Sequence, residues 1–106
     1  MTSGNNAQPA TSSDAIRCFE GSQVRRRIMK VLARVGEAHL EFLAAMARTD
    51  PRSARWAMEG RLPYYAIELS PVALDFARKV QTRTGEAYRI TQRGREAAKV
   101  AKRFER

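Results

Sequence analysis

The sequence contains little of what enzymes, disulfide-stabilised proteins and metal-binding proteins rely on. Cys18 is the single cysteine, so no disulfide can form within the chain. The one histidine, His39, has no second histidine or cysteine at ligand spacing, which argues against a zinc site. A Gly-rich phosphate loop and a nucleophile motif are also missing. These absences predict a protein that is not an enzyme and that holds neither a cofactor nor a metal.

Long apolar runs are equally scarce. No run approaches the roughly 20 residues that a helix needs to cross a bilayer. Residues 1–14 lack the basic start and the apolar stretch of a signal peptide. A lone cysteine suits a reducing compartment. We therefore expect a cytoplasmic protein with no membrane partner, associated with the nucleoid if it binds DNA.

Positive charge, by contrast, is abundant and unevenly distributed. The formal net charge is +9, from 20 lysines and arginines against 11 aspartates and glutamates. Residues 1–21 sum to −1, residues 22–34 to +5, residues 35–75 to −2 and residues 76–106 to +7. Two separate basic segments suit a polyanionic partner, because neutralising phosphates releases counterions and so favours binding. The alternative is a cationic surface that serves solubility alone.

Length and composition predict one folded domain preceded by a tail. A chain of 106 residues is long enough for one core and too short for two domains of ordinary size. Its first 14 residues, MTSGNNAQPATSSD, are mostly small or polar and offer little to bury. We therefore expect a flexible tail over residues 1–21 and a domain over residues 22–106.

A first helix is predicted between Ser22, a good N-cap, and Gly36, a common C-terminal stop. Its apolar residues follow helical spacing and are Val24, Ile28, Val31, Leu32 and Val35. Its other side carries Arg25, Arg26, Lys30 and Arg34. The helix is thus apolar on one side and cationic on the other, and the cationic side can follow phosphates or face water.

Two further helices with a tight turn between them are predicted next. The second helix covers about residues 38–48. Asp50 followed by Pro51 is a strong start signal for the third, which should reach Glu59 before Gly60. Two helices joined by so short a turn indicate a helix-turn-helix, whose second helix can enter the DNA major groove.

The segment over residues 61–79 is open to two interpretations. Pro63 argues against a helix at its start. Ser70 and Pro71 form another cap-and-proline pair, and the apolar spacing beyond them fits a helix over residues 71–79. The same apolar residues also alternate as in a strand, so periodicity does not decide. We favour the helix because the cap chemistry adds to the helical pattern.

A β-hairpin is predicted for residues 80–91. Val80 and Thr82 can oppose Ile90 and Tyr88 if the chain reverses around residues 84–86. The projecting end of this hairpin would be cationic.

A final helix is predicted from Thr91 or Gln92 onward, over about residues 92–106. Its apolar stripe consists of Ala97, Val100, Ala101 and Phe104.

The string YRITQRGREA, residues 88–97, resembles the closing strand and following helix of bacterial and archaeal winged helix-turn-helix transcription regulators. These proteins commonly show Tyr, an aliphatic residue, Thr and then Gly, here Tyr88, Ile90, Thr91 and Gly94. In physical terms, the first two would point into the core, Thr91 would cap the helix and Gly94 would allow close packing. The resemblance implies a mainly α fold with a small β-hairpin, a winged helix-turn-helix with an added C-terminal helix. It also implies that this last helix either supports the domain or forms a homodimer. The apolar stripe that ends in Phe104 favours the homodimer, which would present two recognition elements to a two-fold-symmetric site.

The resemblance also implies that one helix reads the major groove while the hairpin, or wing, contacts phosphates. A recognition helix over residues 51–59 keeps the tight turn, whereas one over residues 71–79 keeps the usual distance to the wing. We favour the former. Arg52 and Arg55 are then expected at bases or phosphates and Ser53 at a phosphate. The alternative for Arg55 is an ordinary helical ion pair with the residue four positions on.

In the wing, Arg83 is the strongest candidate because a cation at a hairpin tip has few structural reasons to exist. The other wing candidates are Arg78, Lys79 and Arg89. The sequence therefore predicts a non-enzymatic protein that binds duplex DNA and regulates transcription. A winged helix that docks onto a protein partner is one alternative, and binding to RNA or single-stranded DNA is another.

Overall fold

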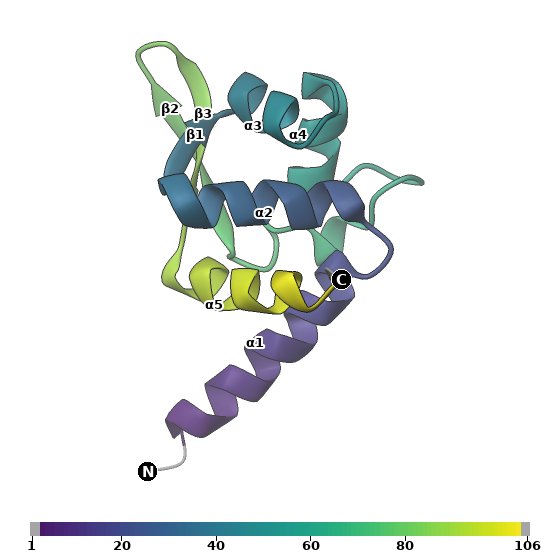
Figure 1. Cartoon of the computed structure of the whole chain (residues 1–106), viewed down its shortest axis with the longest axis vertical. Helices are drawn as coiled ribbons and strands as arrows, with labels where there is room; N and C mark the ends of the chain where they lie inside the picture. The colour runs from purple at the N-terminus through teal and green to yellow at the C-terminus, as the bar shows by residue number, and fades with distance from the viewer. Residues whose placement is uncertain (1–2, 105–106) are drawn as a thin grey trace.

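The computed structural model describes the backbone of residues 3–104 and the side chains of residues 11–104. The described chain is a mainly helical domain with a small antiparallel sheet, as the sequence predicts (Figure 1). Its helices are α1 (Ser3–Phe19), α2 (Gln23–Val35), α3 (Leu40–Met46), α4 (Pro51–Glu59) and α5 (Gln92–Ala101). Its strands are β1 (Glu37–His39), β2 (Ala77–Thr82) and β3 (Gly85–Ile90), in the sheet order β1-β3-β2.

The ends of α2 follow the predicted cap chemistry. The Ser22 hydroxyl accepts a hydrogen bond from the Arg25 amide at 3.2 Å. At the other end, Gly36 adopts a positive φ of 84° and its amide donates to the Leu32 carbonyl. Both signals are local, which is why the sequence alone places this helix correctly. The helix lies across the middle of the domain, between the α3–α4 pair and α5 (Figure 1).

The flexible tail predicted for residues 1–21 is wrong, because α1 covers most of that range and its end belongs to the core. Ala15, Cys18 and Phe19 are fully buried. The helix packs on α5, and Arg93 of α5 donates hydrogen bonds to Thr11 at 2.6 Å and to Asp14 at 2.5 Å. The polar composition of the first 14 residues hid a short apolar stripe at helical spacing in residues 15–19.

Arg25 is buried, whereas the sequence placed it on the cationic side of the first helix. Its side chain is 4 % exposed. The guanidinium donates to the carbonyl of Ala57 at 2.7 Å and to that of Ala66 at 3.0 Å, and it lies 5.1 Å from the Tyr65 ring centroid. Arg25 therefore joins α2 to the end of α4 and to the following loop, a role that helical periodicity does not reveal.

The helix predicted over residues 71–79 is also wrong. Ser70 does cap, since its hydroxyl accepts from the Ala73 amide at 3.1 Å, but only a single turn follows. Asp75 has a positive φ of 61°, which ends the turn, and β2 then begins at Ala77. Neither pattern holds over the whole segment, because residues 71–75 form a turn and only the residues from Ala77 onward form a strand, with Phe76 and Ala77 buried against the core. This removes residues 71–79 as a recognition helix.

The predicted hairpin exists with a different register. Val80 pairs with Ala87 and Thr82 with Gly85, so residues 83 and 84 alone form the connection. The turn is thus tighter than the one expected around residues 84–86. Two-residue connections match the right-handed twist of paired strands, and the turn is held by the Thr82 hydroxyl, which donates to the Gly85 carbonyl at 2.7 Å. The positive φ of 124° at Gly85 suits glycine.

The start of α5 confirms three predictions. Thr91 caps the helix by accepting from the Gly94 amide at 2.9 Å. Tyr88 and Ile90 point into the core. Gly94 lies so close to the Phe76 main chain that a Cβ atom there would overlap the Phe76 carbonyl oxygen. The first turn of α5 therefore packs directly against the residue that precedes β2.

The apolar stripe of α5 is covered within the chain. Ala97, Val100 and Ala101 are buried, and Phe104 packs against the same core. The covering elements are α1 and α2. The stripe is thus not available to a second copy, so the sequence argument for a homodimer through this helix loses its basis. Within the described residues, none of the helices is both long enough and apolar enough to span a bilayer.

Candidate nucleic-acid interface

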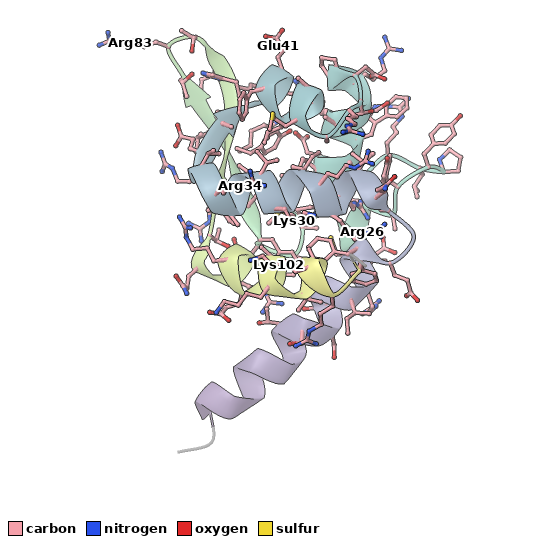
Figure 2. The ribbon with its side chains drawn as sticks, viewed as in Figure 1. Arg26, Lys30, Arg34, Glu41, Arg83 and Lys102 are labelled. Carbon is pink, nitrogen blue, oxygen red and sulfur yellow. The ribbon has the colours of Figure 1, made fainter. Side chains whose placement is uncertain are left out.

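The hairpin and the α3–α4 pair lie at the same end of the molecule, opposite α1 (Figure 1). The hairpin loop projects beyond the body of the domain, and the side chain of Arg83 extends from its tip (Figure 2). The turn between α3 and α4 is short, from Ala47 to Asp50. Two elements that can reach a ligand outside the domain are therefore presented side by side.

Asp50 and Pro51 start α4 as predicted. The Asp50 carboxylate accepts hydrogen bonds from the Ser53 amide at 2.8 Å and from the Ser53 hydroxyl at 3.0 Å. These bonds hold the pKa of Asp50 below its ordinary value, so the N-cap stays ionised. Ser53 is thereby engaged inside the protein, and its hydroxyl reaches a phosphate only by leaving Asp50. Arg52, one position earlier, is exposed.

Four charged side chains and one tyrosine join α4 to the hairpin. Arg55 lies 2.6 Å from a carboxylate oxygen of Glu86 and 3.6 Å from Glu59. Lys79 lies 3.2 Å from Glu59 and 3.7 Å from Glu86. The Tyr88 hydroxyl donates to Glu59. We call these five residues the α4–hairpin cluster. Arg55 and Lys79, two of the predicted contacts, therefore also fix the hairpin against α4.

The electrostatics of the cluster support tight pairing. The hydrogen bond from Arg55 is the main cause that lowers the pKa of Glu86, and the same bond raises the pKa of Arg55. Burial raises the pKa of Tyr88 far above its usual range, and the hydrogen bond to Glu59 raises it further. The tyrosine hydroxyl thus stays protonated and keeps donating to Glu59.

The Glu86 carboxyl should titrate below the ordinary glutamate value of about 4.5, and its pKa should rise in the Arg55→Met variant. A lowered folded pKa stabilises the native state above the ordinary value, and this contribution is lost as the pH falls through the folded pKa. Side-chain carboxyl NMR shifts followed from pH 7 to pH 2 measure both values. Arg52→Met, in the same helix but without this ion pair, is the control. Equal Glu86 titrations in all three proteins would contradict the pairing.

The remaining hairpin candidates divide into paired and unpaired cations. Arg78 pairs with Asp75 at 3.2 Å, and Arg89 pairs with Glu37 of β1 at 2.8 Å. Both pairs are exposed, so each contributes little to stability and can open toward another anion. Of the six predicted cationic contacts, Arg52 and Arg83 are the two for which the described part of the chain contains no ion-pair partner.

His39 holds the hairpin turn, a role that the sequence analysis missed. Its Nε2 atom lies 2.9 Å from the Thr84 hydroxyl and its Nδ1 atom lies 3.2 Å from the Glu86 carbonyl. The contact depends on β1 pairing with β3, where His39 faces Ala87. Because β1 is only three residues long and adjoins α3, no periodic pattern signals it. The histidine positions the tip that carries Arg83.

A groove separates α3 and the start of α4 from the hairpin turn. Its lining includes Phe42, Pro51, Arg55, Thr84 and Glu86. The groove is open to solvent and mixes apolar and charged side chains. Within the part of the chain that the structure describes, no group of three or more acidic, histidine or cysteine side chains could hold a metal ion.

Comparison with models of protein families places the chain in a known family. A family model described as EarA-like matches residues 15–101. The matched range runs from the buried end of α1 through α5, so it includes α1 residues assigned to the tail by sequence reasoning. No curated protein and no solved structure matches the chain.

Proposed function

We propose that the chain, which belongs to the EarA-like family, is a non-enzymatic winged helix-turn-helix protein that binds duplex DNA and regulates transcription. In this proposal α4 is the recognition helix and the β2–β3 hairpin is the wing. The observation that carries it is the placement of Arg52 and Arg83. Both cations are exposed, both lack an ion-pair partner among the described residues, and both lie on elements presented at one end of the domain.

The choice of α4 rests on its surroundings. It follows a tight turn after α3, and its rear side is buried through Ala54, Ala57 and Met58. A helix anchored in this way can enter the major groove with its N-terminal residues, as recognition helices do. Arg52 lies in the first turn, where it can approach base edges, and its fork of N–H donors matches guanine.

The paired cations have a positioning role in this proposal. Arg55 and Lys79 hold the wing at a fixed angle to α4 through Glu59 and Glu86. A fixed angle lets the helix and the wing contact one duplex with little loss of freedom on binding. Arg78 and Arg89 lie along the exposed side of the wing, where their surface ion pairs can exchange for phosphate.

Selection of bound sequences from a random duplex pool tests the proposal, with single-stranded DNA and RNA as competitors. Arg83→Ala should weaken binding to all duplexes alike and reduce the salt slope by about 1, as loss of one phosphate contact does. Arg52→Ala should cost about 1–3 kcal/mol on the selected sequence and relax the preference. Arg17→Ala, an exposed cation on α1, is the control and should change neither quantity.

Two outcomes would overturn the proposal. Absence of salt-dependent duplex binding would remove DNA as the partner. Preferential binding of RNA or single strands over duplex would replace the partner with another nucleic acid.

Protein docking is the second candidate function, because one loop exposes large apolar side chains. Leu62 is 65 % exposed, Tyr64 is 70 % exposed and Ile67 is 49 % exposed. Tyr64 stacks on Trp56 with ring centroids 5.6 Å apart. Apolar and aromatic side chains of this kind anchor protein interfaces. This candidate would be favoured if the wild type binds no duplex but binds a protein partner, and if the Leu62→Asp variant no longer binds that partner.

A further inference from the structure

A second cationic surface lies across α2 and the end of α5, away from the wing. Figure 2 shows Arg26, Lys30 and Arg34 along α2, with Lys102 beside them below α2, while Arg83 stands at the far end of the hairpin. We call this surface, with Arg27 added, the α2–α5 face. Its five cations are all different from the seven residues predicted to contact DNA.

Two hollows make the α2–α5 face continuous. One hollow is lined by the three cations Lys30, Arg34 and Lys102 and by the two small residues Ala33 and Ala98. The second hollow lies toward the end of α3 and is lined by Arg27, Lys30, Val31, Arg34, Met46 and Arg48. Lys30 and Arg34 line both, so the two hollows share one wall. The two alanines are small, so a ligand between them can approach the α2 and α5 backbones closely.

The cations of this face repel one another. Burial lowers the pKa of Lys30, and the positive charges of Arg34, Arg26, Arg27 and Lys102 lower it further. Within the described residues no carboxylate forms an ion pair with any of those four neighbours.

Two arginines of this face donate hydrogen bonds to main-chain carbonyl groups. Arg26 donates to the Phe19 carbonyl at 2.7 Å and Arg27 to the Ala47 carbonyl at 3.3 Å, which orients the guanidinium groups and neutralises neither. Like charges four residues apart destabilise a helix. An anion that binds across them removes this repulsion.

We propose that the α2–α5 face binds the phosphate backbone of a second duplex, so that one protein molecule bridges two DNA segments. This inference rests on the proposed function for the first segment. Because the α2–α5 face and the wing tip point to different sides of the domain (Figure 2), the backbone seated on one is not the backbone seated on the other.

The chemistry of the face favours nucleic acid over an acidic protein. Arg26, Lys30 and Arg34 recur every four residues, so they are spaced about 6 Å apart along the helix axis. Such a row can follow a backbone that carries one charge per 3.4 Å of axis on each strand. A protein partner would use a central aromatic or aliphatic anchor, whereas the hollow between α2 and α5 is lined only by cations and two alanines, and the larger apolar residues Val31 and Met46 line the second hollow.

A co-capture assay tests the inference on the full chain. One duplex is immobilised, the protein is added, and a second, fluorescent duplex without any link to the first is applied. The wild type should retain the second duplex. The variant Lys30→Gln/Arg34→Gln should bind a single duplex within about threefold of wild type yet retain at least tenfold less of the second. Glutamine keeps the helix propensity close to that of lysine and arginine.

Arg17→Gln/Arg61→Gln removes the same charge from exposed positions elsewhere and is the matched control. It should bridge as the wild type does. Bridging that survives the Lys30→Gln/Arg34→Gln variant would overturn the assignment to this face, since it would come from another surface or from self-association. Binding of single duplexes without co-capture would overturn the bridging inference and leave the proposed function intact.

Absence of any duplex binding would instead remove both the proposed function and the inference. Polyglutamate, used as a soluble probe, tests whether the α2–α5 face binds an acidic polypeptide instead of DNA. If it binds the wild type more tightly than duplex does and the variant not at all, the face serves an acidic polypeptide and the inference is wrong.

Discussion

The Phe19→Ala variant should lose about 3–5 kcal/mol of unfolding free energy, as aromatic-to-alanine changes in well-packed cores do. Phe19 is fully buried, and its ring centroid lies 6.5 Å from that of Phe76. The side chain fills the contact between the end of α1 and the core beneath it. Denaturant titration followed by circular dichroism measures the loss. Removing the ring from a mobile tail would change nothing, so the experiment separates the structure from the simpler reading of the sequence.

Ile16→Ala is the matched control because it removes an aliphatic side chain from the same helix at a position that is 41 % exposed. We expect it to cost less than about 1 kcal/mol. A loss as small for Phe19→Ala would contradict the docking of α1 on the domain.

The reactivity of Cys18 is an independent test of whether the end of α1 is docked on the core. Burial raises the pKa of its thiol to about 12, with Arg25 opposing the shift, so very little thiolate exists at neutral pH. Alkylation should therefore be slow in the wild type and faster in Phe19→Ala, because reaction requires α1 to leave the core. Equal alkylation rates in the two proteins would argue against a shared opening event.

The Gly94→Ala variant should be destabilised by about 3 kcal/mol, although alanine normally stabilises a helix interior relative to glycine by roughly 0.5–1 kcal/mol. At Gly94 the change should destabilise the protein instead, because the added methyl group would collide with neighbouring atoms. A Cβ atom at this position would overlap the carbonyl oxygen of Phe76 and would lie 2.8 Å from the Ile90 Cγ1 atom. Since one of these neighbours is main chain, the first turn of α5 must move away from the sheet.

Thermal unfolding measures this effect, and a loss of about 3 kcal/mol corresponds to a fall in Tm of about 12–24 °C for a domain of this size. Gln92→Ala, two residues earlier on an exposed position of the same helix, is the control and should leave Tm within a few degrees. An unchanged or higher Tm for Gly94→Ala would show that α5 does not approach Phe76 so closely.

Local chemistry explains which parts of the fold were predictable. The starts of α2, α4 and α5 were correct because Ser22, Asp50 and Thr91 each cap the helix that follows within three residues. The cap at Ser70 is equally real, yet no helix follows it. There the burial of Phe76 and the pairing of β2 with β3 prevailed over the local signal, and such long-range pairing leaves no mark within a short window.

The candidate interface was predictable in position and not in detail. The sequence alone places Arg52 on a helix that follows a tight turn and Arg83 at a hairpin tip. It does not show that Glu59 and Glu86 converge on Arg55 and Lys79, since those partners are separated by up to 31 residues in the chain. Pairing between distant elements depends on the register of the sheet, which the sequence misassigned.

In the α4–hairpin cluster, the carboxylates of Glu59 and Glu86 already neutralise the positive charges of Arg55 and Lys79. A phosphate that contacts Arg55 or Lys79 must take the place of Glu59 or Glu86, and the displaced carboxylate then attracts a cation that offsets the one released from the DNA. The salt dependence of duplex binding at this end should then reflect Arg52 and Arg83, rather than every cation within reach of the backbone. An interface rich in arginine can thus be less sensitive to ionic strength than its composition suggests.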